Sequence, residues 1–415
     1  MMIPPRAAER QAVPSELPSL DGRIEAGGEA PPVEFSIVMP CLNEADTLRV
    51  CLEKAFGVLQ GSGVSAEVIV ADNGSTDGSV QIAESMGARV IHVSARGYGS
   101  ALMGGIAAAQ GRYIIMGDAD DSYDFLEVPR FVEKLRQGYE LVQGCRLETG
   151  GGRVLPGAMP FLHRWLGNPF FSFLAQHWFH APIHDVYCGL RGFTKELYER
   201  LQQRCTGMEF ATEMIIKASL QGSRILDVPV TLHPDGRRAH APHLRTFRDG
   251  WRTLRFFLLF SPRWLFLVPG SVLILLGLAG YALAMPGTRI RGVSFDAHTL
   301  LFASLALICG FQSILFAVFT KIFAIAEGLL PPDPRLMRVF QHVDLEVGLL
   351  AGAGAMFVGL GLLAAAINQW RLARFGPLDY AETMRWVIPG VTLTTLGFQT
   401  ILSSFFMSVL GMKRR

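Results

Sequence analysis

The chain has 415 residues, of which 50% are hydrophobic, and a formal net charge of +2. This length allows two or three domains, and the nearly neutral charge excludes the basic footprint of a nucleic-acid-binding protein. The apolar residues are concentrated toward the C-terminus, so we expect a soluble half followed by a membrane half. The six cysteines show no C-x-x-C pair or metal-ligand spacing, and we expect free cytosolic thiols.

The first segment, residues 1–32, is rich in Pro, Glu, Arg and Gly and has no apolar core. A segment of this composition buries too little apolar surface to fold, so we predict a disordered tail. It also lacks the apolar region of a secretory signal.

Short apolar runs alternate with helical patterns over residues 33–245, which we predict to be one domain. Strands are expected at 35–39, 68–71, 89–93 and 113–117. Strands that alternate with helices predict an α/β domain with a mostly parallel sheet and helices on both faces. Ligands bind such sheets beyond the carboxyl ends of the strands, so the polar loops after the first, second and fourth strands should form one site.

Three carboxylates, Asp118, Asp120 and Asp121, follow the strand at 113–117. Mg²⁺ and Mn²⁺ prefer carboxylate oxygens, often shared with phosphate oxygens, so the cluster predicts a divalent cation site. An acidic surface loop is the alternative. The polar loops expected at the same edge of the sheet favour the metal.

Three motifs resemble family 2 glycosyltransferases of the GT-A fold: Ser36-Ile-Val-Met-Pro-Cys-Leu-Asn-Glu44, Asp72-Asn-Gly-Ser-Thr-Asp-Gly78 and Asp118-Ala-Asp120. This resemblance implies a Rossmann-like GT-A catalytic domain and a UDP- or GDP-linked sugar donor. It implies that Asp118 and Asp120 hold Mg²⁺ or Mn²⁺ at the diphosphate, with Asp120 the closer ligand. The implied donor-binding residues are Pro40 and Glu44 at the ribose, Asn43, Asp72 at the base, Ser75 and Asp118. Helix capping is a compatible alternative for Asp72 and Ser75, and Asn73 stands where the family usually has a second Asp.

The following segment is less regular. A strand is expected at 140–144, followed by Arg146. The glycines at 97, 99, 104 and 105 allow either a close approach to a ligand or tight helix packing. The aromatic segment 161–179 suits the membrane surface, with a buried core helix as the alternative, and Asn168-Pro169 should break either one.

The run from Asp185 to Phe193 resembles one that follows the metal motif in polyprenyl-phosphate glycosyltransferases. The resemblance implies that Asp185 lies beside the reacting centre and that Arg191 binds the acceptor phosphate. A buried structural Asp–Arg pair is the alternative. Glu209 and Glu213 share one helix face, and either serves the site or the helix N-terminus; Glu213 is favoured.

The basic run from Asp235 to Arg245 resembles the acceptor-phosphate loop of dolichyl-phosphate sugar synthases, with Arg245 where a Lys usually stands. The resemblance implies that Arg237 and Arg245 bind the acceptor phosphate together with Arg146 and Arg191, because guanidinium groups pair well with phosphate. A solvated juxtamembrane run is a compatible alternative. Residues 246–263 place arginines opposite apolar side chains, which predicts an amphipathic interfacial helix.

Residues 264–415 contain four apolar segments, at 264–284, 300–322, 347–367 and 387–410. Each is long enough to cross a bilayer, which takes about 20 residues. We expect a multi-pass protein of the plasma or inner membrane with a cytoplasmic catalytic domain. The second and fourth segments both carry Gly-Phe-Gln, which predicts a duplicated helix pair.

With the resemblance, these features predict the transfer of a sugar from a nucleotide diphosphate to a polyprenyl phosphate of the undecaprenyl or dolichyl type, and the resemblance implies inversion at the anomeric carbon. The acceptor phosphate is largely dianionic at neutral pH, so the enzyme must hold two anions rather than supply a strong base. The expected partners are the nucleotide sugar, the lipid phosphate and the membrane, with a homo-oligomer left open. One alternative is a processive polysaccharide synthase, although its Gln-x-x-Arg-Trp motif is absent before Trp386. The other is a non-catalytic scaffold or flippase-like protein, which the intact Asp118, Asp120, Asp185 and Arg191 disfavour.

Overall fold

The computed structural model describes residues 32–62, 65–237, 246–327, 330–331, 333–334 and 345–411. The predicted tail therefore lies outside the described residues, apart from Pro32, and Arg245 also lies outside them.

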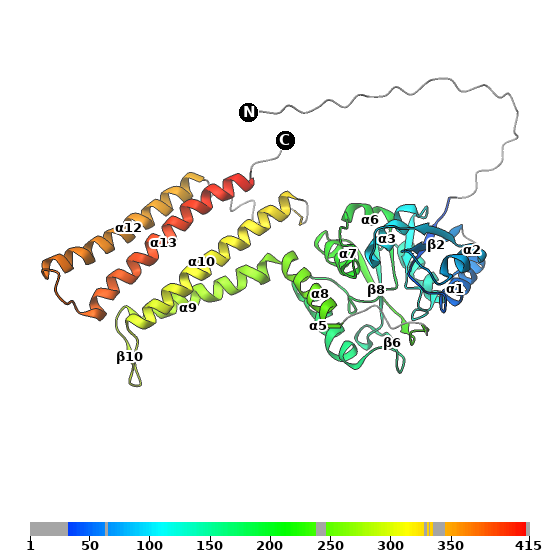
Figure 1. Cartoon of the computed structure of the whole chain (residues 1–415), viewed down its shortest axis with the longest axis horizontal. Coiled ribbons are helices and arrows are strands. Elements are labelled where there is room, and N and C mark those ends of the chain that lie inside the picture. The colour runs from blue at the N-terminus through cyan, green and yellow to red at the C-terminus, as the bar shows by residue number, and fades with distance from the viewer. Residues whose placement is uncertain are drawn as a thin grey trace, which may run out of the picture. The chain divides into compact units, whose positions relative to one another are not determined.

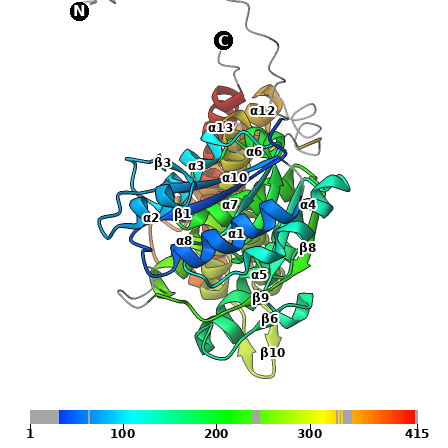
Figure 2. The same cartoon turned by 90° about the vertical axis from the view of Figure 1, so that its right-hand side faces the viewer.

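The first four strands form a parallel sheet, as predicted, and their order is β3-β2-β1-β4. Their bounds are β1 (Phe35–Cys41), β2 (Ala66–Asp72), β3 (Arg89–His92) and β4 (Tyr113–Met116). Between them lie α1 (Leu48–Ser62), α2 (Ser79–Ser85) and α3 (Tyr98–Ala108). Leu48 and Leu52 of α1 pack with Ile37 in one core, and Leu102 of α3 packs with Val38 in another. The sheet is thus covered on both faces, and α1 (blue) lies over one face in Figure 2.

One strand of the central sheet was not predicted. β7 (Arg191–Thr194) lies antiparallel between β4 and β5 (Leu141–Cys145), and β8 (Ile225–Pro229) pairs parallel with β5. The complete sheet has seven strands in the order β3-β2-β1-β4-β7-β5-β8, so it is mostly parallel as expected. The sequence of β7 contains Arg191 and Gly192, so it lacks the apolar run that predicts a strand. Gly192 packs closely against Ile115 of β4, where a larger side chain would not fit.

The remaining elements of this domain surround the sheet. A short pair, β6 (Arg153–Val154) and β9 (Thr231–Leu232), lies beside it. The helices are η1 (Phe125–Glu127), α4 (Val128–Arg136), η2 (Glu148–Gly150), α6 (Lys195–Leu201) and α7 (Glu209–Leu220).

The aromatic segment is helical across Asn168-Pro169, so the predicted break is wrong. A π-helical turn, η3 (His163–Gly167), leads into α5 (Asn168–Phe179). Pro169 lies just after this π-helical turn, and the wider turn allows the helix to continue past a residue that has no N–H. Phe171 and Phe179 are buried in the core, whereas Trp165 and Phe173 are exposed. The buried side agrees with the core-helix alternative, whereas the membrane-surface interpretation of the exposed side stays a prediction.

α8 (Thr246–Phe260) packs on this domain through Phe257, whose ring lies 5.9 Å from Phe171 and 5.4 Å from Phe179. η4 (Arg263–Leu267) follows, and its Trp264 stacks on Trp178 of α5 with ring centroids 5.5 Å apart. Aromatic contacts thus fix α8 and η4 to α5.

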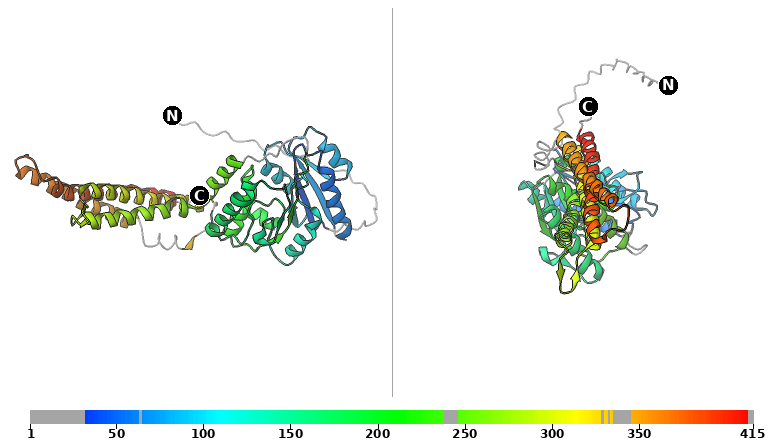
Figure 3. Two further views of the ribbon diagram at one scale, coloured as in Figure 1. Left: turned by 90° about the horizontal axis from the view of Figure 1, so that it is seen from below. Right: turned by 90° about the vertical axis from the view of Figure 1, so that its left-hand side faces the viewer.

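Within the described part of the chain, four helices are long and apolar enough to cross a membrane. They contain α9 (Val268–Ala284), α10 (Ala297–Ala326), α12 (Leu345–Leu372) and α13 (Tyr380–Gly411), which run side by side in Figures 1 and 3. A small hairpin, β10 (Arg289–Ile290) and β11 (Val293–Ser294), joins the first two.

The two helix pairs pack alike. Gly270 of α9 lies against the backbone of Gly310 in α10, and Gly352 of α12 lies against that of Gly397 in α13. Small residues allow such close approach of membrane helices. Gly310 and Gly397 begin the two Gly-Phe-Gln sequences, so the shared packing supports the predicted duplication.

Candidate active site

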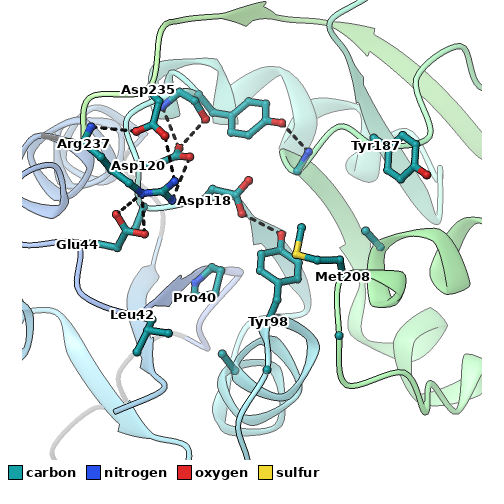
Figure 4. Close-up of a pocket in the computed structure, with 18 of the residues that line it drawn as sticks. Pro40, Leu42, Glu44, Tyr98, Asp118, Asp120, Tyr187, Met208, Asp235 and Arg237 are labelled. Atoms are coloured by element: carbon teal, nitrogen blue, oxygen red, sulfur yellow. Dashed lines mark hydrogen bonds and ion pairs between the residues drawn. The ribbon is translucent and has the colours of Figure 1, made fainter. Parts of the chain in front are cut away.

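A cavity of about 1180 Å³ lies beyond the carboxyl ends of β1, β2 and β4, where the polar loops were predicted to meet (Figure 4). Loops that follow these strands line one part of it. Residues of η3, α5, α8 and the start of α7 line the rest. The predicted site residues among the lining are Pro40, Asn43, Glu44, Asp118, Asp120, Arg146 and Arg237.

Asp118 follows β4 and faces the cavity. Its Oδ1 accepts a hydrogen bond of 2.9 Å from the hydroxyl of Tyr98. A side chain at position 189 would collide with this carboxylate, so Gly189 is required for the close packing. Burial, and then the negative charge of Asp120, raise the pKa of Asp118 to about 6. A cation at this point would stabilise the ionised form.

Asp120 is oriented by its own loop. Its Oδ1 accepts hydrogen bonds from the backbone N–H of Ser122 at 3.1 Å and from its hydroxyl at 2.5 Å. The third acid, Asp121, has a left-handed φ of 60° and forms a 2.7 Å ion pair with Lys54 of α1. Asp121 is not among the lining residues, so the acid cluster that faces the cavity from this loop contains two carboxylates.

Arg237 lies among the acids rather than at a separate phosphate subsite (Figure 4). Its Nε is 3.0 and 2.8 Å from the two carboxylate oxygens of Glu44, Nη1 is 3.0 Å from Asp235, and Nη2 is 3.2 Å from Asp120. Burial alone would lower the pKa of Arg237, but its hydrogen bond to Glu44 and the charges of Asp120, Glu44 and Asp235 raise it. A positive charge is therefore already held at Asp120.

Asp72 and Ser75 are not among the cavity's lining residues and instead build the loop after β2. Asp72 accepts backbone hydrogen bonds from Gly74 at 3.2 Å and Ser75 at 3.0 Å, and the Ser75 hydroxyl accepts one from the Asn43 backbone at 3.0 Å. The N-cap of α2 is Gly78, so neither residue caps that helix. Their contacts fix the loop that presents Asn43 to the cavity.

Asp185 is fully buried and paired with Arg146. Its Oδ2 accepts hydrogen bonds from the Arg146 Nε at 2.7 Å and backbone N–H at 3.0 Å, and its Oδ1 accepts one from Nη2 at 2.9 Å. The Nη1 of Arg146 lies 3.3 Å from the hydroxyl of Tyr123, which also accepts the Gly189 N–H at 2.8 Å. Arg146 lines the cavity and Asp185 does not. Asp185 thus belongs to a buried Asp–Arg pair, but its partner is Arg146 rather than Arg191.

The structure does not bring Arg191 to the cavity. Its side chain is fully buried and donates to the carbonyls of Ala211 at 2.6 Å and Cys188 at 2.8 Å. Burial lowers the pKa of Arg191. This guanidinium joins β7 to α7 behind the site, where a phosphate has no access in this geometry.

The two glutamates of α7 also have structural partners. Glu213 accepts the backbone N–H groups of Arg204 and Cys205 and pairs with Lys217 at 2.7 Å. These contacts hold the loop that leads to Met208, a lining residue. Glu209 lies 3.8 Å from the Nε of Arg252 in α8. Glu213 therefore acts on the cavity only through the loop that it positions.

The part of the cavity nearer α8 is basic and aromatic. Arg248 and Arg252 of α8 line it together with Phe171, Tyr187 and His163. Burial, and then the charge of Arg146, lower the pKa of His163. The cavity thus combines an acidic part at the strand ends with a basic and aromatic part beside α8.

The polar lining residues that were not predicted as site residues include Tyr98, Tyr123, Asp235, His163 and Arg248. Tyr98 lies within the glycine-rich segment, where only the glycines were considered. Gly99 packs against the backbone of Cys205, and Gly105 packs against Val38, so tight packing explains these two glycines.

Comparisons with known proteins agree with this architecture. Residues 36–202 match the glycosyl transferase family 2 domain, and residues 318–411 match the glycosyltransferase family 2 C-terminal transmembrane region. The low-salt glycan biosynthesis hexosyltransferase Agl6 of Haloferax volcanii is 35% identical over 379 residues, which cover 91% of this chain and 89% of that protein. The dolichyl-phosphate hexose transferase of the same organism is 31% identical over 52% of this chain and 89% of its own length. Glucosyl-3-phosphoglycerate synthase of Mycobacterium tuberculosis, solved with Mn²⁺ and UDP, is 21% identical with a TM-score of 0.43, over 55% of this chain and 78% of that chain.

Proposed function

Because this chain belongs to glycosyltransferase family 2, we propose that it transfers a hexose from a nucleotide-diphosphate sugar to a polyprenyl-type lipid phosphate, with inversion at the anomeric carbon. The observation that carries the proposal is the single cavity in which Asp118 and Asp120 share one space with Arg146 and α8. The name of the relative that transfers hexose to dolichyl phosphate supports the lipid acceptor.

The donor side suits a divalent cation bound together with a diphosphate. Among the described residues, no group of three or more His, Cys, Asp or Glu side chains could hold a metal alone. Mg²⁺ usually binds through one or two carboxylates, with phosphate oxygens and water completing its shell. Asp118 and Asp120 provide such a pair, and the guanidinium of Arg237 at 3.2 Å from Asp120 supports a preference for positive charge at this point. The bound ion would neutralise charge on the diphosphate leaving group.

On the acceptor side, we assign the lipid phosphate to Arg146. Asp185 and Tyr123 fix the orientation of this guanidinium, which faces the cavity with 10% of its side chain exposed. Arg248 and Arg252 of α8 add positive charge to the same part of the cavity. Asp185 is thereby a positioning residue, since its carboxylate is fully buried against Arg146.

The proposed reaction needs little proton transfer. An oxygen of the acceptor phosphate forms a bond to the anomeric carbon, while the bond from that carbon to the donor diphosphate breaks and its electron pair leaves with the diphosphate. The acceptor phosphate is already largely dianionic near neutral pH. The protein's contribution is therefore to bring two anions together and to stabilise their charge.

The chain is a membrane protein, and its organisation suits a lipid substrate. We propose a catalytic domain over residues 33–245, a juxtamembrane helix over 246–263 and a membrane domain over 264–415. The Trp178–Trp264 stack connects α5, which borders the cavity, to the start of the first membrane span. The headgroup could then enter the cavity while the lipid tail stays in the bilayer. A nucleotide-sugar donor places the catalytic domain in the cytoplasm.

A transfer assay tests this proposal. Membranes that contain the protein are incubated with radiolabelled nucleotide sugars and a short polyprenyl phosphate, and Asp120→Asn serves as the inactive control. We expect one labelled, charged lipid product that depends on the added lipid phosphate. Labelled polymer would indicate a processive synthase instead, and the absence of any labelled product across the common UDP- and GDP-sugars would contradict the proposal.

A further inference from the structure

We propose that Arg237 is a built-in substitute for the divalent cation and competes with it for Asp120, so that the metal binds tightly only together with the donor diphosphate. This inference rests on the proposed function, because it concerns the same acid pair. It adds that the binding of the metal is coupled to the binding of the donor diphosphate. It also changes the role of Arg237 from a contact of the acceptor phosphate to a cation that balances the acidic side chains.

Arg237 is paired with several acidic side chains of the cavity. The guanidinium bridges three carboxylates that all line the cavity, those of Glu44, Asp120 and Asp235, at 2.8 to 3.2 Å. Only 12% of the Arg237 side chain is exposed. A metal ion that binds Asp120 would bring a second positive charge next to the guanidinium in a poorly solvated space, where like charges repel strongly.

The backbone under Arg237 is fixed, so the side chain is the part that can move. The Gly236 N–H donates to the carbonyl of Asp120 at 3.0 Å, and the Arg237 N–H donates to Asp235 at 2.9 Å. A Cβ at Gly236 would lie 2.9 Å from Thr47, whose hydroxyl donates to the Ala119 carbonyl at 2.7 Å. The turn that carries Arg237 is therefore tied directly to the loop that carries Asp120.

The charges explain why a diphosphate should release the side chain. Four carboxylates line this part of the cavity: Glu44, Asp118, Asp120 and Asp235. Among the described residues, Arg237 is the cation paired with three of them, whereas Arg146 is already paired with Asp185. A diphosphate offers the guanidinium charge-assisted hydrogen bonds in exchange for those it gives up. Asp120 is then open to the metal, so the metal and the diphosphate favour each other's binding.

Metal binding by the purified full-length protein tests the inference without any turnover. Free Mn²⁺ is measured by electron paramagnetic resonance, with Mn²⁺ alone and with Mn²⁺ plus UDP or GDP. In the wild type, we expect weak binding of Mn²⁺ alone and much tighter binding with the fitting diphosphate. Arg237→Gln should bind Mn²⁺ alone about tenfold more tightly or better, and the gain from the diphosphate should shrink accordingly. Arg237→Lys keeps the charge and should stay closer to the wild type.

Lys54→Gln is the matched control, because Lys54 is paired with the neighbouring Asp121 and does not line the cavity. This pair is partly exposed, with 27% and 30% of the two side chains accessible, so solvent screens it and its loss should change Mn²⁺ affinity by less than about twofold. Equal effects of Lys54→Gln and Arg237→Gln, or no gain in the latter, would overturn the inference. A misfolded variant does not gain metal affinity, so the expected tightening cannot arise from damage to the fold.

Asp120→Asn separates the inference from the proposed function. If this variant loses Mn²⁺ binding while Arg237→Gln shows no gain, the acid pair is the metal site and only the role of Arg237 is wrong. If Asp120→Asn binds Mn²⁺ as the wild type does, the metal site fails and the competition fails with it.

Discussion

Substitution of Asp185 by Asn tests whether this carboxylate positions Arg146 or takes part in the chemistry. The side chain is isosteric, but it removes the charge that faces the Arg146 guanidinium at 2.7 and 2.9 Å. Loss of one partner from a buried ion pair costs about 3–5 kcal/mol, and the amide keeps part of the hydrogen bonding, so we expect about 2–3 kcal/mol. If the misoriented Arg146 guanidinium passes this cost on to the acceptor complex, kcat/KM for the lipid phosphate should fall about 30- to 140-fold, because 1.4 kcal/mol corresponds to a factor of ten.

The assay is sugar transfer at saturating donor over a range of acceptor concentrations, with nucleotide affinity measured separately. We expect the loss in the KM for the acceptor, with nucleotide affinity changed by less than about twofold, since Asp185 does not line the cavity. A double-mutant cycle with Arg146→Gln is decisive, because the double variant should be no worse than Arg146→Gln alone.

Additive losses in that cycle, or a lower kcat with an unchanged acceptor KM, would refute the positioning role and favour direct participation of Asp185. Asp227→Asn is a matched control, because Asp227 is another largely buried acid, is paired with His184 at 2.9 Å, and is not among the lining residues. It should leave the acceptor KM unchanged.

Three further outcomes are expected. Gly189→Ala should lower turnover at least about tenfold, because its methyl group would displace the Asp118 carboxylate, and wild-type turnover would contradict the geometry. Burial raises the pKa of Asp227 to about 6, so stability present below its ordinary pKa is lost as the pH rises through about 6. Asp227→Asn cannot ionise, so its free energy of unfolding relative to the wild type should rise by up to about 3 kcal/mol between pH 4 and pH 8. Thermal unfolding in detergent measures this difference, and a difference that does not change with pH would exclude the ionisation of Asp227 as its cause. Phe257→Ala should destabilise the protein by about 3–5 kcal/mol, since its buried ring holds α8 on α5, and an unchanged melting temperature would show that this packing contributes little.

The parts of the site that the sequence predicted are those encoded locally. Each of β1, β2 and β4 is an apolar run that ends in a polar motif, and a parallel sheet brings such ends together. Pro40, Glu44, Asp118 and Asp120 could be located in this way. The four candidate membrane spans could be predicted in the same way, because a run of about 20 apolar residues is visible in the local sequence.

The partners of the arginines could not be predicted, because they depend on contacts between distant segments. Arg237 meets Glu44 across 193 positions, and Arg146 meets Asp185 across 39. The proximity of Arg191 to Asp185 in the sequence suggested the wrong pair. β7 turns the Arg191 side chain away from Asp185 toward the carbonyls of Cys188 and Ala211.

In the proposed mechanism, a cation-dependent donor site and a lipid-phosphate site share one cavity next to the membrane. The most direct test is the transfer of radiolabelled sugar to added polyprenyl phosphate, before and after treatment with a chelator. We predict a labelled anionic glycolipid whose formation stops when the chelator is added and resumes with Mn²⁺ or Mg²⁺. Formation of the same lipid at an undiminished rate in the presence of the chelator, or label transferred only to material that does not depend on the lipid phosphate, would contradict the account.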